Sequence, residues 1–443
     1  MRDVVFAYRT LFASLYTTEG HKSLTEYVGE AYKERTASDS LIVDAIFRVT
    51  EKILGSSVGT SVVQSLEKNN YVSTVDHHGP LSHPAFFQPN LLRTILDTEI
   101  GLPATIVLSC ASVSLDNHTY PRGFYFYDNF GERVRLPLFS LHDRHHSVYG
   151  QRPFTHADAE LNILKLRQYG EVYDGLLTLL QDEQLYTLET YRAQITYINH
   201  CLMREICPEG GNFVSIAIED VVRELLCTSF LEHDPLTSGI LFNAKTRDFF
   251  LKETNGIQTS HDFTRRETTV LFWGQRNGVR VPLRIVGEYL IDEIREIQIH
   301  LDVRSIQIAL HEEKIFPNLA LSLILLSSRG MDQGGGFFQV DYLPSLVLHA
   351  QKVSSQSGLD YMTWGKTDYL GGDFSFMPKF IGRDVTALDI LKNPPCVTDI
   401  KYYADTVSVA EAIDRIIPDM YHILDNKLRN EWEHIVMNTT DSL

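Results

Sequence analysis

The sequence predicts an α/β protein: a Rossmann-like, mostly parallel sheet with a helical N-terminal segment, an antiparallel β insertion and a helical C-terminus. Two patterns lead to this prediction. The first is a strand, loop, helix and strand over residues 71–109, about the length of a right-handed parallel crossover. The second is a pair of strand-like stretches joined through Asn277-Gly278, which is typical of an antiparallel hairpin.

The N-terminal segment is predicted to be helical. Apolar residues between 42 and 53 recur with a spacing near 3.6, and Ser38 or Ser40 can cap the start of this helix. Gly55 and Gly59 then interrupt the pattern, and a second helical piece covers residues 61–67.

The first part of the core follows. A β-prone stretch at 71–75 leads into a loop over 76–84, and a helix is expected to start near Pro89, because proline is tolerated in a first turn. Residues 104–109 form a buried-looking strand, and residues 123–150 are expected to form sheet edges and loops.

The middle of the chain changes from helical to strand-like patterns. Two long helices, 156–184 and 186–206, are predicted to form an antiparallel pair, followed by a helix over 216–229. Strand-like stretches then occur at 239–243, 248–252, 268–275 and 279–285.

The chain is expected to rejoin the main sheet over 316–350, where apolar stretches flank a glycine loop, and to end in a helix. Ser408 and Glu411 form a candidate capping box for that helix, which is interrupted only by Pro418. We therefore divide the chain into a helical N-terminal segment (1–70), two parts of the core (71–155 and 301–400), a helical insertion (156–235), an antiparallel β-containing segment (236–300) and a C-terminal helix (401–443).

Composition limits the class of protein. The chain carries 40 basic and 57 acidic residues, a net charge of −17, without a basic stripe, so we expect no nucleic-acid partner. The 5 cysteines are an odd number without regular spacing, which favours a reducing cytoplasm over a disulfide framework. We find neither a leader peptide nor an apolar run of the roughly 20 residues needed to cross a bilayer, so we expect a soluble cytoplasmic protein without a membrane partner.

Histidines are concentrated in one stretch. Eight of the 17 histidines lie between residues 77 and 156. The first group, 76–83, falls where the predicted unit turns from strand to helix, the end of an open α/β sheet at which ligands bind. We predict that His78, His83 and Arg144 are catalytic and stabilise phosphate charge. Binding residues are predicted to be Asp76, His77, Gly79, Asp116, His118 and His146.

Two other interpretations of this stretch stay open. Asp76, His78, Asp116 and His146 supply nitrogen and carboxylate ligands suited to a divalent metal. Alternatively, individual histidines pack or are merely exposed, and Asp76 caps the loop. Cys110 ends a buried strand, so we interpret it as a packing residue rather than a nucleophile.

The glycine loop is the second candidate binding segment. Consecutive glycines at 334–336 let the backbone approach a ligand closely, although a plain flexible turn explains them equally well. Gln339 and Asp341 are expected to share one face of a strand, and Tyr342 the other. The predicted binding residues of this segment are Arg329, Gly335, Gly336, Gln339, Asp341 and Tyr342.

Three of these segments together resemble the bacillithiol-synthesis cysteine-adding enzymes, a family with a Rossmann core related to class I synthetases. Residues 75–87 occupy the place of that family's first loop, 115–120 (Leu-Asp-Asn-His-Thr-Tyr) resemble its second, and 335–339 resemble a glycine-containing segment near its substrate site. The family's Gln-Gln loop is replaced here by residues 76–79, and His78 and His83 are not spaced as in the His-x-Gly-His signature of related adenylyltransferases.

A second partial match is to the Asp-His-His phosphoesterases, which use paired metal ions. Those enzymes need an earlier Asp-x-Asp motif, and residues 1–75 contain none.

The resulting hypotheses come from three classes. The first is an ATP-dependent ligase or nucleotidyl-transfer enzyme that joins a small polar acceptor to an amino acid or carboxylate. The second is a metal-dependent hydrolase, and the third is a non-catalytic metabolite-binding protein. ATP and a divalent metal are the candidate cofactors and a small molecule is the expected partner. The oligomeric state is left open.

Overall fold

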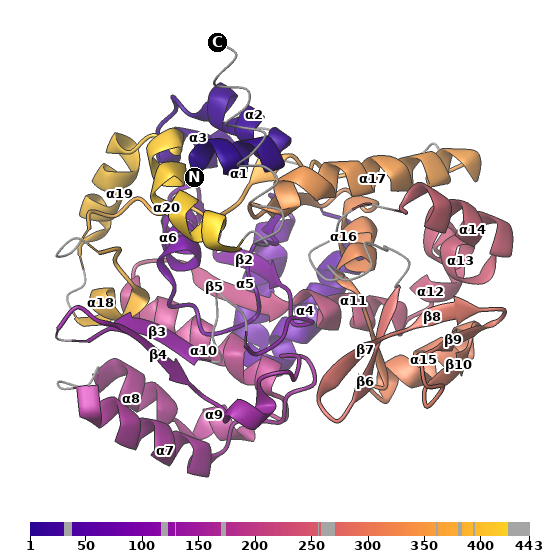
Figure 1. The fold of residues 1–443 in the computed structure, drawn as a ribbon, viewed down its shortest axis with the longest axis horizontal. Helices are drawn as coiled ribbons and strands as arrows, with labels where there is room; N and C mark the ends of the chain where they lie inside the picture. The colour runs from indigo at the N-terminus through magenta and orange to yellow at the C-terminus, as the bar shows by residue number, and fades with distance from the viewer. Residues whose placement is uncertain are drawn as a thin grey trace.

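A single parallel sheet forms the centre of the protein. The computed structural model describes residues 1–30, 38–116, 123–128, 130–169, 174–255, 257, 271–359, 362–379, 383–392 and 395–423. Within them, five parallel strands have the order β13-β12-β1-β2-β5 (Figure 1). Their bounds are β1 Tyr71–Ser73, β2 Ala104–Ser109, β5 Asn212–Ala217, β12 Asp332–Gly335 and β13 Tyr369–Leu370.

The strand order is that of Rossmann folds. Numbered along the chain, the five strands lie in the order 5-4-1-2-3, which read from the other edge is 3-2-1-4-5. From β1 the chain builds outward through β2 to β5, then returns to add β12 and β13 on the other side of β1. The predicted Rossmann-like parallel sheet is therefore confirmed.

Helices cover the sheet. All six residues of β2 are buried, as expected for a parallel strand covered on both faces. Helices α5 (Ser56–Leu66) and α6 (Pro84–Glu99) contact β2, and α10 (Tyr191–Ile206) contacts β5.

The two end segments pack together, as the indigo and yellow helices of Figure 1 show. Helix α20 (Val409–Ile423) contacts α1 (Arg2–Tyr8), α2 (Thr10–Glu19) and α3 (Leu24–Glu30). The predicted capping box is present, because the Ser408 N–H donates to Glu411 and the Glu411 N–H donates to Ser408 Oγ. The helical N- and C-terminal segments are confirmed.

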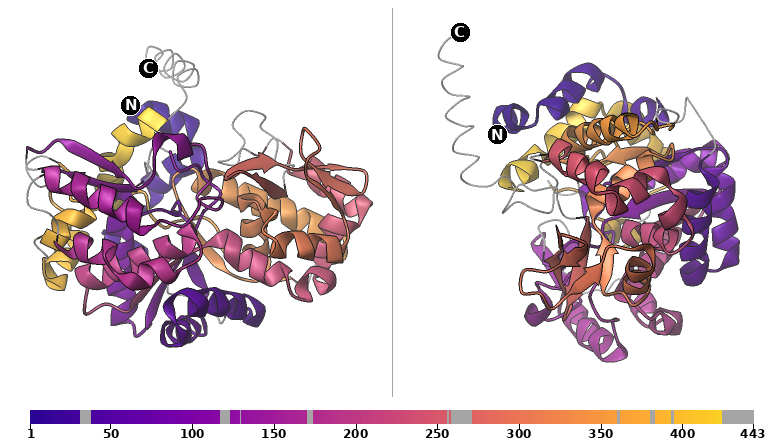
Figure 2. Two further views of the ribbon diagram at one scale, coloured as in Figure 1. Left: turned by 90° about the horizontal axis from the view of Figure 1, so that it is seen from below. Right: turned by 90° about the vertical axis from the view of Figure 1, so that its right-hand side faces the viewer.

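The antiparallel insertion lies on one side of the sheet, away from the β3–β4 hairpin (Figures 1 and 2). It contains the three-stranded sheets β11-β6-β7 and β10-β9-β8. Asn277 and Gly278 have φ of 49° and 79°, as the predicted tight hairpin turn between β6 and β7 requires. The strands of the separate hairpin are β3 Gly123–Tyr127 and β4 Arg133–Pro137. The strands of the insertion are β6 Phe272–Arg276, β7 Val279–Pro282, β8 Arg284–Val286, β9 Tyr289–Ile291, β10 Gln298–His300 and β11 Ile315–Pro317.

The remaining helices surround these sheets. Within the described residues no helix is both long and apolar enough to cross a membrane. The remaining helices are α4 Ser40–Leu54, η1 Leu141–Asp143, α7 His156–Leu166, η2 Arg167–Tyr169, α8 Asp174–Leu180, α9 Glu183–Thr187, α11 Ile218–Leu226, α12 Phe230–His233, α13 Pro235–Phe242, α14 Ala244–Glu253, α15 Val303–His311, α16 Leu319–Ser327, α17 Gln339–Gln356, α18 Ala387–Lys392 and α19 Val397–Thr406.

Several predicted elements were wrong. The stretches 239–243 and 248–252 lie in helices α13 and α14, whose N-caps Asp234 and Asn243 accept hydrogen bonds from the first turns. A run of about five apolar residues is compatible with either a strand or a buried helix, so the capping residues are the signal that distinguishes the helices here. Strand β5 was missed within the predicted helical insertion (156–235), and the helix predicted over 156–184 is broken into shorter pieces.

Two helix starts also differ from prediction. Helix α6 begins at Pro84, with His83 as its N-cap, and Pro89 lies within the helix. Helix α4 is capped by Asp39, between the two serines considered, and the Asp39 side chain accepts from the Leu41 N–H.

Candidate functional site at the carboxyl edge of the sheet

The order in which the chain adds strands to the sheet reverses between β1 and β12. From these neighbouring strands the chain builds the sheet toward opposite edges, and in open α/β sheets ligands bind beyond the carboxyl ends at such a switch point. The residues that follow the strands here are 74–78 after β1, 336–337 after β12 and 371–373 after β13.

Asp76 lies at the carboxyl end of β1 and is only 3% exposed. Its Oδ2 accepts a hydrogen bond of 2.7 Å from Asn90 of α6, and its backbone carbonyl accepts from the Cys110 N–H. Its Oδ1 is buried and has no hydrogen-bond partner among the residues that the structure describes. Burial, with a contribution from the charge of Asp373, raises the pKa of Asp76 to about 8.

Asp373 follows β13 and faces the same switch point. Its φ of 59° is left-handed, an uncommon conformation for a residue with a side chain. Its Oδ2 accepts a 2.6 Å hydrogen bond from the Phe337 N–H, directly after the glycine loop. Burial raises the pKa of Asp373 to about 6.

The glycines at the end of β12 and directly after it allow the glycine loop to pack closely against Asp373 and β1. A Cβ at Gly336 would lie 2.5 Å from Asp373 Oδ2 and 3.2 Å from Val75 Cγ1. A Cβ at Gly335 would lie 2.6 Å from Gln339 Cβ, and one at Gly334 would overlap the Tyr71 hydroxyl. The three glycines therefore let β12 and the start of α17 approach β1 and Asp373.

Gln339 joins the two sides of the switch point. Its Oε1 accepts from Thr74 Oγ1 and its Nε2 donates to the Thr74 carbonyl, both at 2.8 Å. It lies in the first turn of α17 and not in a strand, so the predicted strand register of Gln339, Asp341 and Tyr342 was wrong. Strand β12 ends at Gly335, and helix α17 begins four residues later, at Gln339.

A third buried carboxyl group extends the row toward β5. Glu219 is 0% exposed and accepts hydrogen bonds from the backbone N–H groups of Ala111 and Ser112, at 2.9 and 2.8 Å. The Cys110 Sγ lies 3.5 Å from Glu219 Oε1. Burial raises the pKa of Glu219. Because these backbone donors engage both oxygens, Glu219 fixes the loop after β2.

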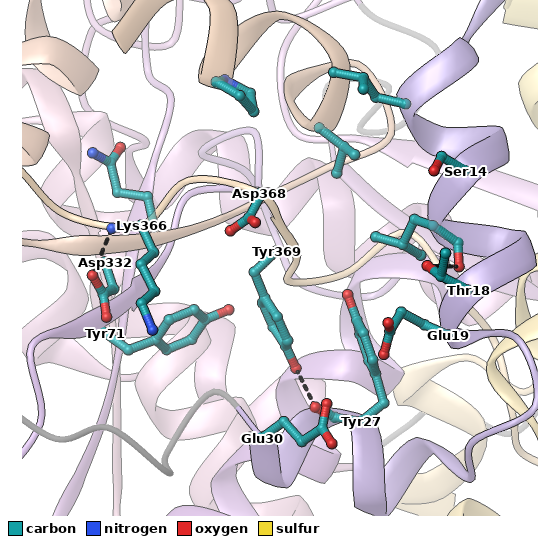
Figure 3. Close-up of a pocket in the computed structure, with 15 residues that line it drawn as sticks. Ser14, Thr18, Glu19, Tyr27, Glu30, Tyr71, Asp332, Lys366, Asp368 and Tyr369 are labelled. Carbon is teal, nitrogen blue, oxygen red and sulfur yellow. Dashed lines mark hydrogen bonds between the residues drawn. The ribbon is translucent and has the colours of Figure 1, made fainter. Parts of the chain in front are cut away.

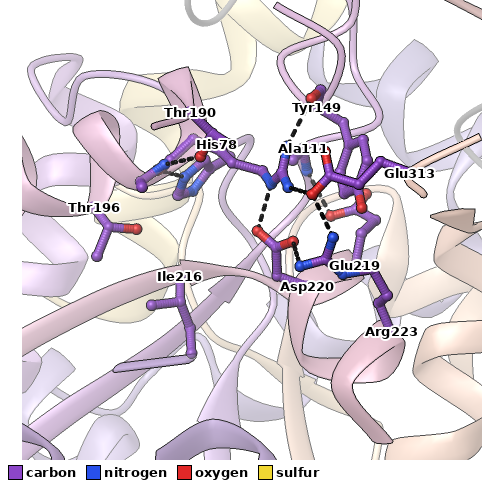
Figure 4. Close-up of polar contacts among 12 residues, drawn as sticks. His78, Ala111, Tyr149, Thr190, Thr196, Ile216, Glu219, Asp220, Arg223 and Glu313 are labelled. Atoms are coloured by element: carbon purple, nitrogen blue, oxygen red, sulfur yellow. Dashed lines mark hydrogen bonds and ion pairs between the residues drawn. The ribbon is translucent and has the colours of Figure 1, made fainter. Parts of the chain in front are cut away.

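A buried ion-pair network adjoins this end of the sheet (Figure 4). Arg192 Nε donates to Asp220 Oδ2 at 2.6 Å, and Arg192 and Arg223 both pair with Glu313. Burial opposes ionisation of Asp220, but the two guanidinium groups outweigh it and lower the pKa of Asp220. The network ties α10 and α11 to the segment after α15.

The two predicted catalytic histidines have structural contacts. His78 Nδ1 lies 2.6 Å from Ser109 Oγ and Nε2 lies 2.7 Å from the Arg192 carbonyl, so both ring nitrogens are occupied (Figure 4). His83 accepts from the Ala85 N–H as the cap of α6 and packs on Phe86 and Tyr125. Burial lowers the pKa of His78 to about 4 and that of His83 to about 3. Both rings are therefore neutral near pH 7.

The third predicted catalytic residue, Arg144, lies in another part of the protein. Segments 111–116 and 144–149 pair through backbone hydrogen bonds, including Asp116 N–H to the Arg144 carbonyl at 3.1 Å. Arg144 and Asp116 are exposed. His146 Nδ1 lies 2.7 Å from Gln151 Oε1, and its ring lies against Gly278 in the β6–β7 turn.

The other predicted binding residues are dispersed. His77 forms a backbone bridge with Cys110, and the Gly79 carbonyl accepts from Asn199. Asp341 accepts from the Leu11 N–H, Tyr342 is buried, and Arg329 pairs with Asp234 and Asp39. His118 lies outside the described residues. The predicted residues that converge at the switch point are thus Asp76, Gly335, Gly336 and Gln339.

The predicted metal set is not assembled. Asp76 and His78 are buried at the end of β1, whereas Asp116 and His146 belong to the paired segments beyond β2. Across the described part of the chain, no three His, Cys, Asp or Glu side chains come together as a metal-binding group.

Asp373, Glu219 and Asn90 were missed from the sequence. Glu219 follows β5, a strand that was not predicted, so its position at the carboxyl edge could not be inferred. The sequence Gly371-Gly372-Asp373 did carry a signal, because two glycines before a carboxylate are typical of a close turn. The contact between Asp373 and the glycine loop depends on tertiary structure.

Comparison with models of known protein families gives no match, and comparison with curated protein sequences also gives none. The fold and the row of buried carboxyl groups define an α/β protein with Rossmann strand order and an acidic switch point. The resemblance to the bacillithiol-synthesis family stays a prediction.

Proposed function

We propose that the protein is an enzyme of small-molecule metabolism whose substrate binds at the switch point, with Asp76 as general acid and Asp373 as general base. One observation carries this proposal. Two carboxyl groups with pKa values of about 8 and about 6 face the end of the sheet at which ligands of such folds bind. Paired titratable groups whose environments separate their pKa values are typical of acid–base catalysis.

The protonation states suit these roles. Near pH 7, Asp76 is mostly protonated and Asp373 mostly ionised, given these pKa values. The Oδ1 atom of Asp76 is buried and accepts no hydrogen bond from the described residues, so it is the oxygen that can carry the acid proton. Asn90 holds Oδ2 of Asp76 in place, and the Phe337 N–H holds Oδ2 of Asp373.

The reaction we propose to test first is ATP-dependent ligation or nucleotidyl transfer. The Rossmann strand order supports it, because such folds bind nucleotides at this edge. The short turn from β12 into the 18-residue helix α17 supplies a helix N-terminus beside the carboxyl pair, which can interact with phosphate. Arg144 is exposed on another segment, so this proposal gives it no role.

The test is exchange of labelled pyrophosphate into ATP with trial amino acids and carboxylates, together with ATP titration by calorimetry. Asp76→Asn and Asp373→Asn should each reduce exchange by about 10²- to 10⁴-fold, the usual contribution of a general acid or base. Asp116→Asn is the matched control and should leave exchange unchanged, whereas a metal site that uses Asp116 would lose activity.

The pH profile gives a second measurement. The exchange rate should rise as Asp373 ionises near pH 6 and fall as Asp76 ionises near pH 8. Asp373→Asn should remove the acidic limb and Asp76→Asn the alkaline limb. ATP binding without exchange for any substrate would favour a non-catalytic metabolite-binding protein, and absence of both would overturn the nucleotide reaction.

A further inference from the structure

The segment that follows β13 lies against the loop after β1. We call residues 371–377 the strap, and none of them belongs to a helix or a strand. A Cβ at Gly372 would lie 3.0 Å from Val75 Cγ1, so the strap is in direct contact with the residue before Asp76. Asp373 is itself part of the strap. The strap therefore carries one member of the carboxyl pair and borders the other.

The strand from which the strap leaves is firmly held. The rings of Tyr369 and of Tyr27 in α3 are stacked with centroids 4.8 Å apart, and the Tyr369 hydroxyl donates to the Tyr27 carbonyl (Figure 3). The Leu370 N–H donates to the Tyr27 hydroxyl, and the Gly371 N–H donates to a carbonyl of β12 at 2.9 Å. Because β13 is fixed by α3 and β12, a hinge can lie only after it, at the pair of glycines that begins the strap.

One side chain of α6 holds the far end of the strap. The Oε1 atom of Gln88 accepts hydrogen bonds from the N–H groups of Phe376 and Met377, at 2.8 and 2.9 Å, and from Ser375 Oγ at 3.2 Å. Its Nε2 atom donates to the Val385 carbonyl at 3.0 Å. Gln88 is 0% exposed, so these bonds are made away from water, where an N–H group left without an acceptor costs free energy.

Apolar packing and helix α20 complete the attachment of the strap. Phe374 and Phe376 are 2% and 0% exposed, and Arg415 of α20 donates to the Met377 carbonyl at 2.8 Å. A carbonyl of α20 accepts a long bond of 3.4 Å from the Ser375 N–H. These contacts favour the closed strap, but the acceptor for the N–H groups of both 376 and 377 is Gln88.

We propose that the strap is a gate over the switch point and that Gln88 is its latch. This inference rests on the proposed function, in which a substrate must reach the Oδ1 atom of Asp76. That atom is buried, so a substrate can reach it only after a covering segment moves. The strap is suited to this movement, because it has glycines at one end and is held at the other by one side chain. Closure over a bound substrate would then exclude water from the carboxyl pair.

The first test measures access to Asp76 in the full chain. Carboxyl groups are labelled with a water-soluble carbodiimide and glycine ethyl ester, and the labelled peptides are quantified by mass spectrometry. In Gln88→Ala, labelling of Asp76 should increase about tenfold, because opening becomes more favourable when the bonds to the latch are lost. Asp44, exposed on α4, is the internal reference and should be labelled equally in both proteins. Unchanged labelling of Asp76 in the folded variant would overturn the proposal.

Hydrogen exchange of the strap, with a matched control, separates a latch from general destabilisation. Gln194 of α10 is also 0% exposed, and its amide bonds to both the N–H and the carbonyl of Phe154. Gln88→Ala should speed exchange in the peptide 371–377, whereas Gln194→Ala should speed it near Phe154 and leave the strap unchanged. Equal acceleration of the strap in both variants would refute a specific latch.

A second variant acts at the hinge and decides the question if Gln88→Ala does not fold. Gly372→Ala brings a Cβ to 3.0 Å from Val75 Cγ1, which is tighter than ordinary contact, so it should push the strap outward and raise labelling of Asp76 about threefold. Wild-type labelling in every variant that folds would rule out the gate. Neither measurement needs ATP or turnover. Opening in Gln88→Ala without pyrophosphate exchange in the wild type would refute the proposed function and support the gate, whereas exchange that depends on Asp76, with labelling unchanged, would refute the gate alone.

Discussion

At the residue scale, the environment of Asp76 favours its protonated form. The side chain is 3% exposed, and its carboxyl group accepts a hydrogen bond from the neutral Asn90 amide. The unfolded chain ionises an aspartate near its ordinary pKa of about 4, whereas the folded protein holds the proton to about pH 8. The site therefore keeps a proton donor at some cost in stability.

This difference makes stability depend on pH. Because the folded pKa is raised, the stabilising contribution of Asp76 is complete below about pH 4 and is lost as the pH rises toward about 8. The slope is at most about 1.4 kcal/mol per pH unit for one group. Asp76→Asn cannot ionise, so the variant should gain stability relative to the wild type between pH 5 and pH 8.

Urea unfolding at several pH values measures the effect. Asp116→Asn is the control for the loss of one carboxylate, because Asp116 is exposed. A constant difference between Asp76→Asn and the wild type across this range would show that Asp76 does not titrate as proposed.

At the element scale, buried ion pairs connect helices that local sequence patterns do not bring together. The Arg192 side chain is 5% exposed and pairs with Asp220 of α11 and with Glu313 after α15. Its guanidinium also lies 4.1 Å from the centroid of the Tyr149 ring. The orientation of α10, which carries the Arg192 carbonyl that accepts from His78, depends on these contacts.

Arg192→Met should therefore be strongly destabilising. Removing one partner leaves Asp220 with a buried charge that Arg223 neutralises only in part, and such changes cost about 3–5 kcal/mol. Arg48→Met is the matched control, because Arg48 pairs with Glu224 of the same helix α11 but is 43% exposed, and such pairs are worth about 0–1 kcal/mol. Similar free energies of unfolding for both variants, measured in urea, would contradict the structural role of the network.

At the scale of the whole molecule, the sequence predicted the fold better than the site. Strand β2, the end helices and the Asn277-Gly278 turn depend on local patterns, and all three are present. The site depends on which strand ends become neighbours. The charge of Asp373 acts on Asp76 because β13 and β12 return beside β1. The Nε2 atom of His78 is bonded because α10 brings the Arg192 carbonyl to it. Histidine density pointed to the end of β1, where the structure places the buried Asp76, whereas His78 and His83 themselves have structural contacts.

Contacts between the two ends of the chain make a prediction about cooperativity. Ile413 of α20 is 0% exposed, and α20 packs on the N-terminal helices. Ile413→Ala should lower the free energy of unfolding by about 2–5 kcal/mol through the cavity that it leaves. If the end helices and the rest of the protein unfold as one unit, the helical circular dichroism and the tryptophan fluorescence should shift together, because Trp273, one of the three tryptophans, lies in β6, in a different part of the protein. Leu348→Ala, at a position of α17 that is 53% exposed, should change stability by less than about 0.5 kcal/mol. A shift in the circular dichroism alone would show that the end helices unfold separately from the region around Trp273.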